Sequence, residues 1–176
     1  MAFLRKNLAL IMIGLGLLMS QSYRVLAADI YFVKSLYIYN FIMATEFYPA
    51  LKHTITICTI GDDHFGTSLD KASEKLSSRY EIIIKRGVLI DDIPHCNALF
   101  VGSSEAYRLE KIFFKMADLP ILSISEIKDF VNKGGIIEFR DMRDGKIGFA
   151  VNIKTAKQLK LKFDPGLLEL AVEIVH

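Results

Sequence analysis

The sequence lacks the short motifs by which many enzyme classes are recognised. It has no Gly-x-Gly-x-x-Gly, no Walker motif and no His-Glu-x-x-His. Its four histidines are scattered, and no His–Asp partner can be assigned to a serine. We therefore expect no catalytic residues, no metal site and no cofactor, and we do not expect an enzyme.

Charge of one sign is not concentrated anywhere in the chain. The sequence carries 22 basic and 20 acidic residues, and Arg5, Lys6 and Arg24 lie in an N-terminal segment that we expect to be removed. Their loss lowers the basic residues by three, to 19, against the same 20 acidic residues. No basic block remains that could follow a phosphate backbone, so nucleic acid is not an expected partner.

The N-terminal segment has the three-part pattern of a secretory signal. Arg5 and Lys6 precede an uncharged apolar run, Leu8–Met19, and Val25 and Ala27 then occupy the −3 and −1 positions for cleavage after Ala27. The alternative, a membrane anchor, needs roughly 20 apolar residues, and this run is shorter. We expect residues 1–27 to be a signal peptide and the mature chain to lie in the periplasm without membrane insertion.

The rest of the chain, residues 28–176, is predicted to form one α/β domain. Thr54–Ile60 alternates β-branched and apolar residues and stops at Gly61, and Phe65–Lys75 then has helical spacing. A strand, a glycine turn and a helix open a βαβ unit, and later segments repeat that order. Further strands are expected at Tyr80–Lys85, Ala98–Val101, Ile121–Ile124 and Ile136–Arg140, and further helices from Ser103 or Ser104 to about Met116, after Ser125, from Thr155 and after Asp164.

Near the end of the chain, Asp144-Gly145 predicts a tight hairpin turn with Lys146–Ile153 as the returning strand. The hairpin pair must be antiparallel, so the sheet is expected to be mainly parallel with an antiparallel hairpin at its edge. The predicted fold is a single three-layer α/β domain with helices on both faces of the sheet. The helix after Asp164 is expected to bury an apolar stripe of Leu167, Leu168, Ala171, Val172 and Val175.

The segment Ile30–Phe47 is predicted to be a helix that ends before Pro49. It is apolar on nearly all sides, which is typical of a helix that is buried or lies in an interface. One interpretation is a core helix that covers a face of the sheet, and the other is a surface for a partner or a second copy. For the second interpretation the candidate partner-binding residues are Tyr31, Tyr39 and Phe47, because aromatic side chains dominate interface hot spots.

Two turns carry polar residues directly after predicted strands. Gly61–His64 follows the Thr54–Ile60 strand, and Gly102–Glu105 follows the Ala98–Val101 strand. Open α/β sheets often bind ligands at this end of their strands. The alternative is that the acidic residues only favour the start of a helix. The candidate ligand-binding residues are Asp62, Asp63, Ser103 and Ser104.

Cysteine is scarce, because Cys58 and Cys96 are the only two in the chain. In an exported protein such a pair is most simply one disulfide, which here would close a loop of about 38 residues and stabilise the fold by roughly 3–4 kcal/mol. A metal pair or a reactive thiol is the alternative, and the absence of a Cys-x-x-Cys spacing argues against both.

Several stretches, taken together, resemble the YfiR family of periplasmic regulators. They occur in the family's order and span nearly the whole of the mature chain. Each stretch is weak alone, and the ordered set makes the resemblance specific. The stretches are Lys34–Phe41, Thr45–Pro49, Ile57–Gly66, His95–Glu105, Ile121–Glu126, Gly134–Ile137, Phe149–Ile153 and Leu167–Ala171.

The resemblance implies a protein that binds and represses the periplasmic part of an inner-membrane signalling protein, a diguanylate cyclase, and thereby controls cyclic di-GMP. It implies release of repression by envelope or redox stress. Cys58 and Cys96 match the family's cysteine positions, which agrees with a disulfide between them. A homodimer is a further expectation. The alternative function is a periplasmic small-ligand-binding sensor module.

The chain departs from the family's pattern at three places, and one is Phe163–Gly166 before the last helix, which replaces a more serine-like segment. The family usually has a tryptophan before the proline of the first helix motif, whereas here Phe47 and Tyr48 precede Pro49 and the chain has no tryptophan. Some members carry a second cysteine pair near the glycine-rich strand, and Ile136–Ile153 has none. A redox switch that depends on that second pair is therefore not expected.

Overall fold

The structure is a computed structural model that describes residues 30–51, 53–76, 80–143 and 145–176. The expected signal peptide, residues 1–27, lies outside this part, so its cleavage stays a prediction. Within the described ranges, no helix is long and apolar enough to cross a membrane.

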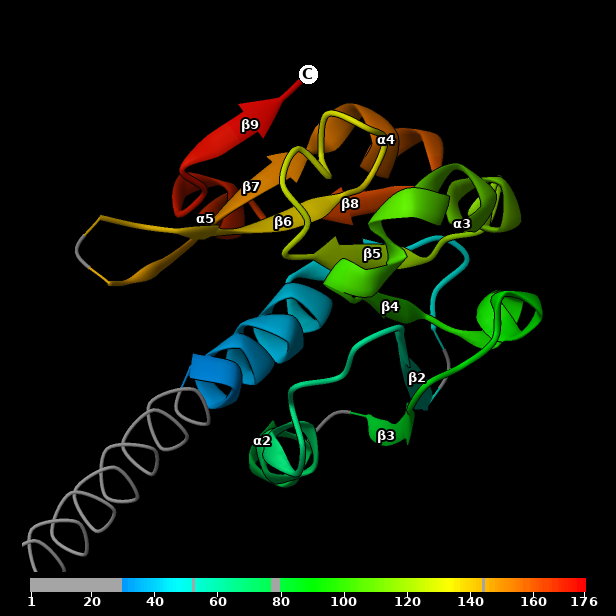
Figure 1. Ribbon diagram of the computed structural model, residues 1–176. Helices are drawn as coiled ribbons and strands as arrows, with labels where there is room; N and C mark the ends of the chain where they lie inside the picture. Colours follow the sequence, from blue (N-terminus) through cyan, green and yellow to red (C-terminus); the bar gives the residue numbers. More distant parts are fainter. Residues whose placement is uncertain (1–29, 52, 77–79, 144) are drawn as a thin grey trace, which may run out of the picture.

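A seven-stranded sheet forms the middle layer, in the order β3-β2-β4-β5-β6-β7-β9 (Figure 1). The strands from β3 to β6 are parallel, β7 runs antiparallel to β6, and β9 runs parallel to β7. The predicted mainly parallel sheet with an antiparallel hairpin is confirmed, and the short β9 lies outside the hairpin at that edge. The strands are β2 Thr54–Ile60, β3 Glu81–Lys85, β4 Ala98–Val101, β5 Leu122–Ser125, β6 Ile137–Asp141, β7 Ile147–Asn152 and β9 Glu173–Val175.

Helices cover both faces of the sheet, as predicted. Side chains alternate along β2, so Ile55 and Ile57 enter one core and Cys58 and Ile60 enter the other. We call these sides the first face and the second face. The first face carries the helix at residues 30–43, α2 Ser68–Leu76, α4 Ile153–Gln158, α5 Pro165–Glu169, and a two-stranded sheet of β1 Thr45–Phe47 and β8 Leu161–Phe163. The second face carries the 3₁₀ helices η1 Ile90–His95 and η2 Ser103–Arg108, the helix α3 Leu109–Met116, and segment 126–136.

The helix predicted at Ile30–Phe47 is shorter than expected and ends at residue 43. Its last predicted residues, Thr45–Phe47, form β1 and pair antiparallel with Leu161–Phe163 of β8. Buried and exposed side chains alternate along β1. This two-residue period arises from pairing with a distant segment, which the local apolar pattern does not show.

The helix predicted after Ser125 is not formed, and segment 126–136 consists of successive turns. Side chains from neighbouring strands hold the backbone of these turns. The Glu138 carboxylate of β6 accepts hydrogen bonds from the amides of Asp129 and Val131. These bonds come from outside the segment, and they replace the bonds that a helix would make along its own axis.

The last predicted helix is also shorter. α5 has Asp164 as its N-cap, as predicted, but it ends at Glu169. Leu167 of the predicted stripe is buried, whereas Val172 is half exposed and Val175 lies in β9. Strand pairing with β7 therefore takes the place of the last helical turn.

Candidate functional site

The two polar turns predicted from the sequence meet at the ends of β2 and β4. Their glycines allow a very close approach, because a Cβ atom on Gly61 would lie 2.5 Å from Ser104 Oγ. A Cβ atom on Gly102 would lie 2.5 Å from the carbonyl oxygen of Asp62. The Asp62 amide also donates a hydrogen bond of 2.9 Å to Ser104 Oγ. The turns thus fill the space between them, and Asp62 and Ser104 form a contact within the chain.

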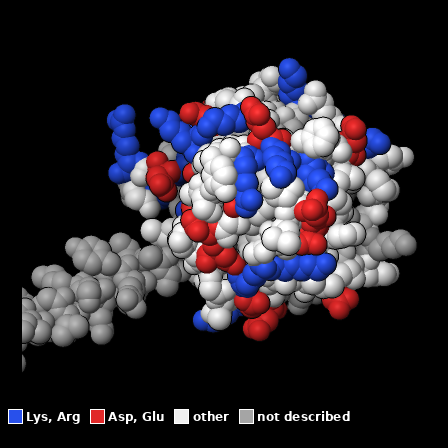
Figure 2. All heavy atoms as spheres, turned by 45° about the vertical axis from the view of Figure 1, so that its right-hand side comes forward, with Lys and Arg blue, Asp and Glu red and all other residues white. Residues whose placement is uncertain are grey.

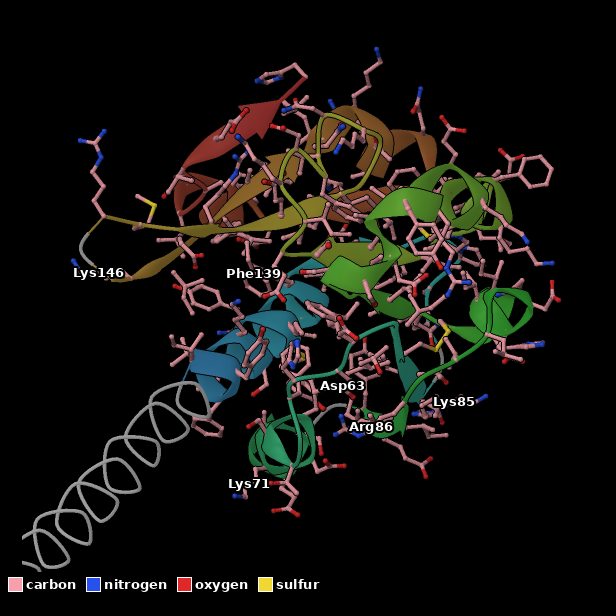
Figure 3. The ribbon with its side chains drawn as sticks, in the orientation of Figure 1. Asp63, Lys71, Lys85, Arg86, Phe139 and Lys146 are labelled. Carbon is pink, nitrogen blue, oxygen red and sulfur yellow. A yellow bond between two sulfur atoms is a disulfide. The ribbon has the colours of Figure 1, made fainter. Side chains whose placement is uncertain are left out.

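Asp63 turns toward Arg86 instead (Figure 3). The Arg86 guanidinium donates to Asp63 Oδ2 over 2.6 Å and to Asp70 Oδ2 of α2 over 2.7 Å. Asp63 also accepts hydrogen bonds from Thr59 Oγ1 and from the amide of Phe65. Both carboxylate oxygens of this predicted ligand residue therefore have partners in the chain, and they fix the turn to the end of β2 and to α2.

Ser103, the fourth predicted ligand residue, belongs to a polar junction at the end of β5. Its Oγ donates to Glu126 Oε1 over 3.4 Å. Tyr31 OH donates to the same oxygen over 3.0 Å, and Lys34 Nζ donates to Glu126 Oε2 over 2.5 Å. The Lys34 side chain is 7% exposed and that of Glu126 is 17% exposed, so water has little access to the ion pair. We call this group the Glu126 junction.

The Glu126 junction ties the first helix to the turns that follow β4 and β5. Burial, and next the charge of Glu126, raises the pKa of Tyr31, so the phenol keeps its proton and donates. Sequence reasoning missed Lys34 and Glu126. The signal that could have found them is a lysine on an otherwise apolar helix, because a buried lysine requires an acidic partner.

Two of the three predicted partner-binding residues lie in the core, which corrects that prediction. Tyr39 is 2% exposed, and its OH donates to the Leu69 carbonyl of α2 over 3.1 Å. Burial raises the pKa of Tyr39 to about 12. Phe47 is also buried, because it faces inward from β1. Tyr31 is half buried in the Glu126 junction, so none of the three is a freely exposed anchor.

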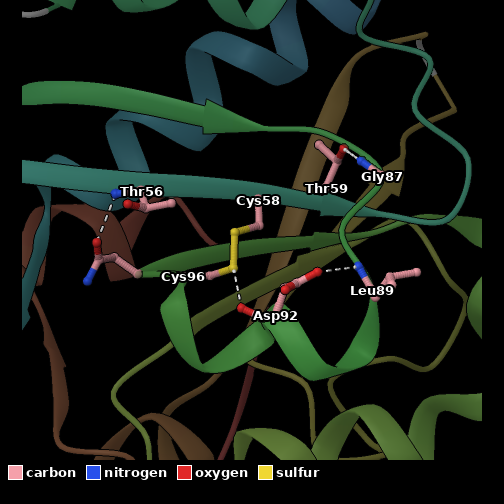
Figure 4. The surroundings of a disulfide bond; sticks show 8 residues. Thr56, Cys58, Thr59, Gly87, Leu89, Asp92 and Cys96 are labelled. Carbon is pink, nitrogen blue, oxygen red and sulfur yellow. Dashed lines mark hydrogen bonds between the residues drawn. A yellow bond between two sulfur atoms is a disulfide. The ribbon is translucent and has the colours of Figure 1, made fainter.

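A disulfide joins Cys58 of β2 to Cys96 at the end of η1, with 5.9 Å between the Cα atoms (Figure 4). Both side chains are buried on the second face, in the same core as the inner side of α3. At the other end of η1, the Leu89 amide donates to Asp92 Oδ2. The Asp92 carbonyl oxygen lies 3.8 Å from Cys96 Sγ. The bridge therefore fastens η1 covalently to β2, the strand next to the β3 edge of the sheet.

An exposed apolar surface lies on the outer side of η1 and α3. The inner side of α3 is buried at Leu109, Ile112 and Met116. Phe114, on the outer side of α3, is 83% exposed, and Tyr107 of the preceding η2 is 81% exposed. Figure 2, which turns this side of the molecule forward, shows charges of both signs among white atoms.

We call this region the η1–α3 surface. On α3 it includes Glu110, Lys111 and Phe114, and Tyr107 lies in the preceding 3₁₀ helix η2. Leu89, at the start of η1, is 72% exposed, and Lys115 Nζ binds Asp91 over 2.7 Å, which joins α3 to η1. The Lys115 ammonium group lowers the pKa of Asp91. The surface consists of Leu89, Tyr107, Glu110, Lys111 and Phe114.

A groove of about 800 Å³ opens on the opposite side of the molecule, between the end of the first helix, β1, β8 and α5. Phe47 and Tyr80 contribute to its lining, and Glu46 and Lys162 are a pair of charged residues there, 3.4 Å apart and both 77% exposed. None of the four ligand residues predicted from the sequence lines this groove.

Comparison with solved structures finds similar folds at low sequence identity. A conserved domain protein from Vibrio cholerae O1 biovar El Tor matches with a TM-score of 0.50 and 11% identity, over 69% of this chain and 54% of that one. The ABC domain in complex with L-Trp from Streptococcus pneumonia matches with a TM-score of 0.56 and 14% identity, over 80% of this chain and 60% of that one. This chain thus spans less than two thirds of either, and the likeness shows the fold alone.

Comparison with curated proteins gives no match. A family model described as YfiR/HmsC-like matches residues 31–172, which is nearly all of the described chain. The motifs noted in the sequence fall within this range, and they include both cysteines of the disulfide. The extent of the match shows that this chain belongs to the YfiR/HmsC-like family.

Proposed function

We propose that this protein binds and represses a membrane signalling protein, a diguanylate cyclase, from the periplasmic side and so controls cyclic di-GMP. The observation that carries the proposal is family membership over residues 31–172, because the family consists of periplasmic regulators of cyclic di-GMP signalling. The exposed surfaces of the chain then suggest where it binds the signalling protein.

The η1–α3 surface supports direct protein binding better than the first helix does. Tyr107 and Phe114 are rigid aromatic side chains with most of their area in water, and such residues dominate the binding energy of protein interfaces. Glu110 and Lys111 lie between them in the sequence and are exposed, so they can give charge complementarity and orientation. The partner is expected to cover both aromatic rings.

The disulfide supports a link between this surface and envelope redox conditions. Cys96 closes η1, and Leu89 of the surface opens it. Reduction of the Cys58–Cys96 bond would release the end of η1 from β2. The η1–α3 surface would then lose its fixed shape, so the bound signalling protein would be released. This is a redox response that needs only the one cysteine pair present in the chain.

The proposal can be tested by measuring cyclic di-GMP in a strain that lacks this protein and is complemented with variants. A variant carrying both Tyr107→Ala and Phe114→Ala should melt close to the wild type, because neither ring is in the core. It should fail to lower cyclic di-GMP and should not co-purify with solubilised membranes. Truncating an interface anchor costs about 2 kcal/mol or more, which is about 30-fold in affinity.

Leu170→Ala is a matched control, since Leu170 is 69% exposed and lies by the groove. It should repress as the wild type does. Full repression by the Tyr107 and Phe114 variant would place the contact elsewhere. Failure of the wild type itself to change cyclic di-GMP would remove the proposed function.

The second candidate function is a small-ligand sensor, and the groove of about 800 Å³ favours it. Its volume is within the roughly 300–1,000 Å³ of small-molecule sites. One protein of similar fold is described in complex with L-Trp. L-tryptophan is therefore a reasonable first probe. Under this proposal it should raise the melting temperature of the wild type, and Lys162→Ala should abolish the rise.

A further inference from the structure

The turn of the β6–β7 hairpin carries the most exposed sulfur-containing side chain of the described residues. The hairpin projects away from the rest of the sheet, and Met142 directly follows β6 (Figure 1). Met142 is 39% exposed, whereas Met43 is half buried and Met116 is 2% exposed. Both cysteines are joined in the disulfide, so no thiol competes for an oxidant. An oxidant in solution therefore has its best access to the thioether of Met142.

Met142 is exposed on one side and packed on the other. A Cβ atom on Gly148 of β7 would lie 3.0 Å from Met142 Sδ and 3.0 Å from Val172 Cγ1. The two side chains therefore meet above Gly148 and fill the space that a larger residue would need there. Gly148 is buried beneath them. The sulfur atom thus lies in the contact between the hairpin turn and Val172.

Val172 is the residue that leads into the edge strand β9. Its amide donates to the Phe149 carbonyl of β7 over 2.9 Å, and Glu173–Val175 then pair with β7. β9 has only three residues and none of them is buried, so it adds little to either core. A partly exposed ion pair between Arg140 and Glu173 also holds it. The contact between Met142 and Val172 is therefore one of the few that keep β9 in place.

We propose that Met142 is an oxidation site, at which a peroxide converts the thioether to a sulfoxide and so releases β9. A lone pair on Sδ attacks one oxygen of hydrogen peroxide, one S–O bond forms and the O–O bond breaks. The departing hydroxide takes the proton from the transferred oxygen and leaves as water. The sulfur is oxidised by two electrons, and the peroxide is reduced by the same two.

The sulfoxide weakens the contact because it is polar. Oxidation changes a flexible apolar side chain into a polar one. The new oxygen would lie against Gly148 and Val172, and a polar group packed on apolar neighbours without a hydrogen bond opposes that arrangement. The oxygen reaches water when the hairpin turn and Val172 move apart. Opening of β9 should therefore become about tenfold more frequent.

Release of β9 also affects the groove on the first face. The segment that connects α5 to β9 includes Leu170, and Leu170 lines the groove. When Val172 is released, α5 alone holds this segment, so the wall of the groove becomes less ordered. This response to peroxide requires neither cysteine nor a bound partner. Its reversal requires methionine sulfoxide reductases, one for each epimer of the sulfoxide.

The choice of methionine is tested by treating the folded, exported protein with hydrogen peroxide and following each sulfoxide by mass spectrometry of its peptide. Met142 should be oxidised at least about tenfold faster than Met116, with Met43 between them. In denaturant the three rates should become similar, which is the control for access. Oxidation of Met43 or Met116 ahead of Met142 in the folded protein would overturn the proposal.

Hydrogen exchange tests the consequence for β9. After peroxide treatment the Val172 amide should exchange about tenfold faster than before, while the amides of β2 should not change. A pair of methionine sulfoxide reductases should restore the slower rate. Equal rates at Val172 before and after oxidation of Met142 would contradict the release of β9. An untreated protein in which this amide already exchanges as fast as in the unfolded chain would contradict it too.

Three variants separate Met142 from the other methionines. M142L keeps an apolar side chain of similar size, so its Val172 amide should exchange slowly both before and after peroxide. M142Q has the polarity of the sulfoxide and should exchange fast without peroxide. M43L is the matched control and should respond to peroxide as the wild type does. An M142L variant that still responds, or an M142Q variant with slow exchange, would overturn the proposal.

Discussion

The aromatic residues of the first helix and those around α3 have opposite roles. The helix at residues 30–43 is rich in apolar side chains, and its Phe41 and Tyr39 are almost fully buried. α3 is short and looks ordinary in the sequence, yet Phe114 and Tyr107 beside it are more than four fifths exposed. A surplus of apolar residues on a helix therefore does not by itself mark an interface.

The first helix uses its surplus because several elements surround it. The ring centroids of Phe41 and Phe149 of β7 lie 4.8 Å apart, which packs the helix on the sheet. Tyr39 reaches α2, and Tyr37 OH donates to the carbonyl of Ile147. The sides that carry Phe41, Tyr39 and Tyr37 thus each have a neighbour, while Val33 remains 41% exposed. α3 has one inner side and a solvent-facing outer side, and that outer side carries the exposed ring of Phe114.

The largest difference should come from the same substitution made in the two regions. Phe41→Ala opens a cavity in the core on the first face of the sheet and should lower the free energy of unfolding by about 3–5 kcal/mol. Phe114→Ala removes an exposed ring and should change it by less than about 0.5 kcal/mol. Chemical denaturation of both variants measures this. Equal losses would mean that the ring of Phe114 packs in solution.

The next effect should come from the disulfide on the second face. Replacing both cysteines, Cys58→Ser with Cys96→Ser, removes the cross-link between two residues with a sequence separation of 38, so the unfolded chain gains conformational entropy. The free energy of unfolding should fall by about 3–4 kcal/mol. Hydrogen exchange should accelerate in η1 and leave the helix at residues 30–43 unchanged. Faster exchange in both regions would show that the disulfide stabilises the cores on both faces of the sheet.

A smaller effect is expected from the Glu126 junction. Glu126→Gln leaves the buried Lys34 ammonium group without its charged partner and should lower the free energy of unfolding by about 2 kcal/mol. Glu46→Gln is the control, because its pair with Lys162 is exposed and should be worth less than about 0.5 kcal/mol. Thermal melting compares the two. Equal shifts would show that water reaches the junction.

The smallest effect is a pH dependence that belongs to the first helix. Below pH 10 Tyr39 is protonated in both states, and above it the unfolded chain releases the proton while the folded chain holds it to about pH 12. Stability should therefore fall as pH rises from 10 to 12, by about 1–2 kcal/mol for this residue. Tyr39→Phe should fall less steeply than the wild type in denaturation at each pH. Parallel curves would contradict the raised pKa.

The parallel core of the fold is readable from the sequence. Buried parallel strands give short, continuous runs of β-branched and apolar residues, as in Thr54–Ile60 and Ala98–Val101, and glycines mark their ends. The three-residue strands cannot be predicted from local sequence in this way, because they form only by pairing with another segment. Thr45–Phe47 is paired with Leu161–Phe163, far along the chain, and its local pattern favoured a helix.

The same limit applies to predicting the candidate site from the sequence. The sequence predicts a polar turn after β2 and another after β4, and in the structure the two turns meet. It does not show that Gly61 and Gly102 bring them into direct contact, because that depends on the distance between two strands. The exposure of Tyr107 and Phe114 likewise depends on which side of α3 faces the sheet. A short 3₁₀ segment before the helix makes that side hard to assign from spacing.

The disulfide also changes what a protease can do to this protein. Together with the intervening backbone, the Cys58–Cys96 bond closes a covalent ring that includes α2, β3 and η1. A single cut anywhere inside that ring leaves both pieces joined through sulfur. The nicked molecule therefore keeps all of its residues. Its two pieces separate only after the disulfide is reduced, so loss of the protein requires both a backbone cut and a reduction.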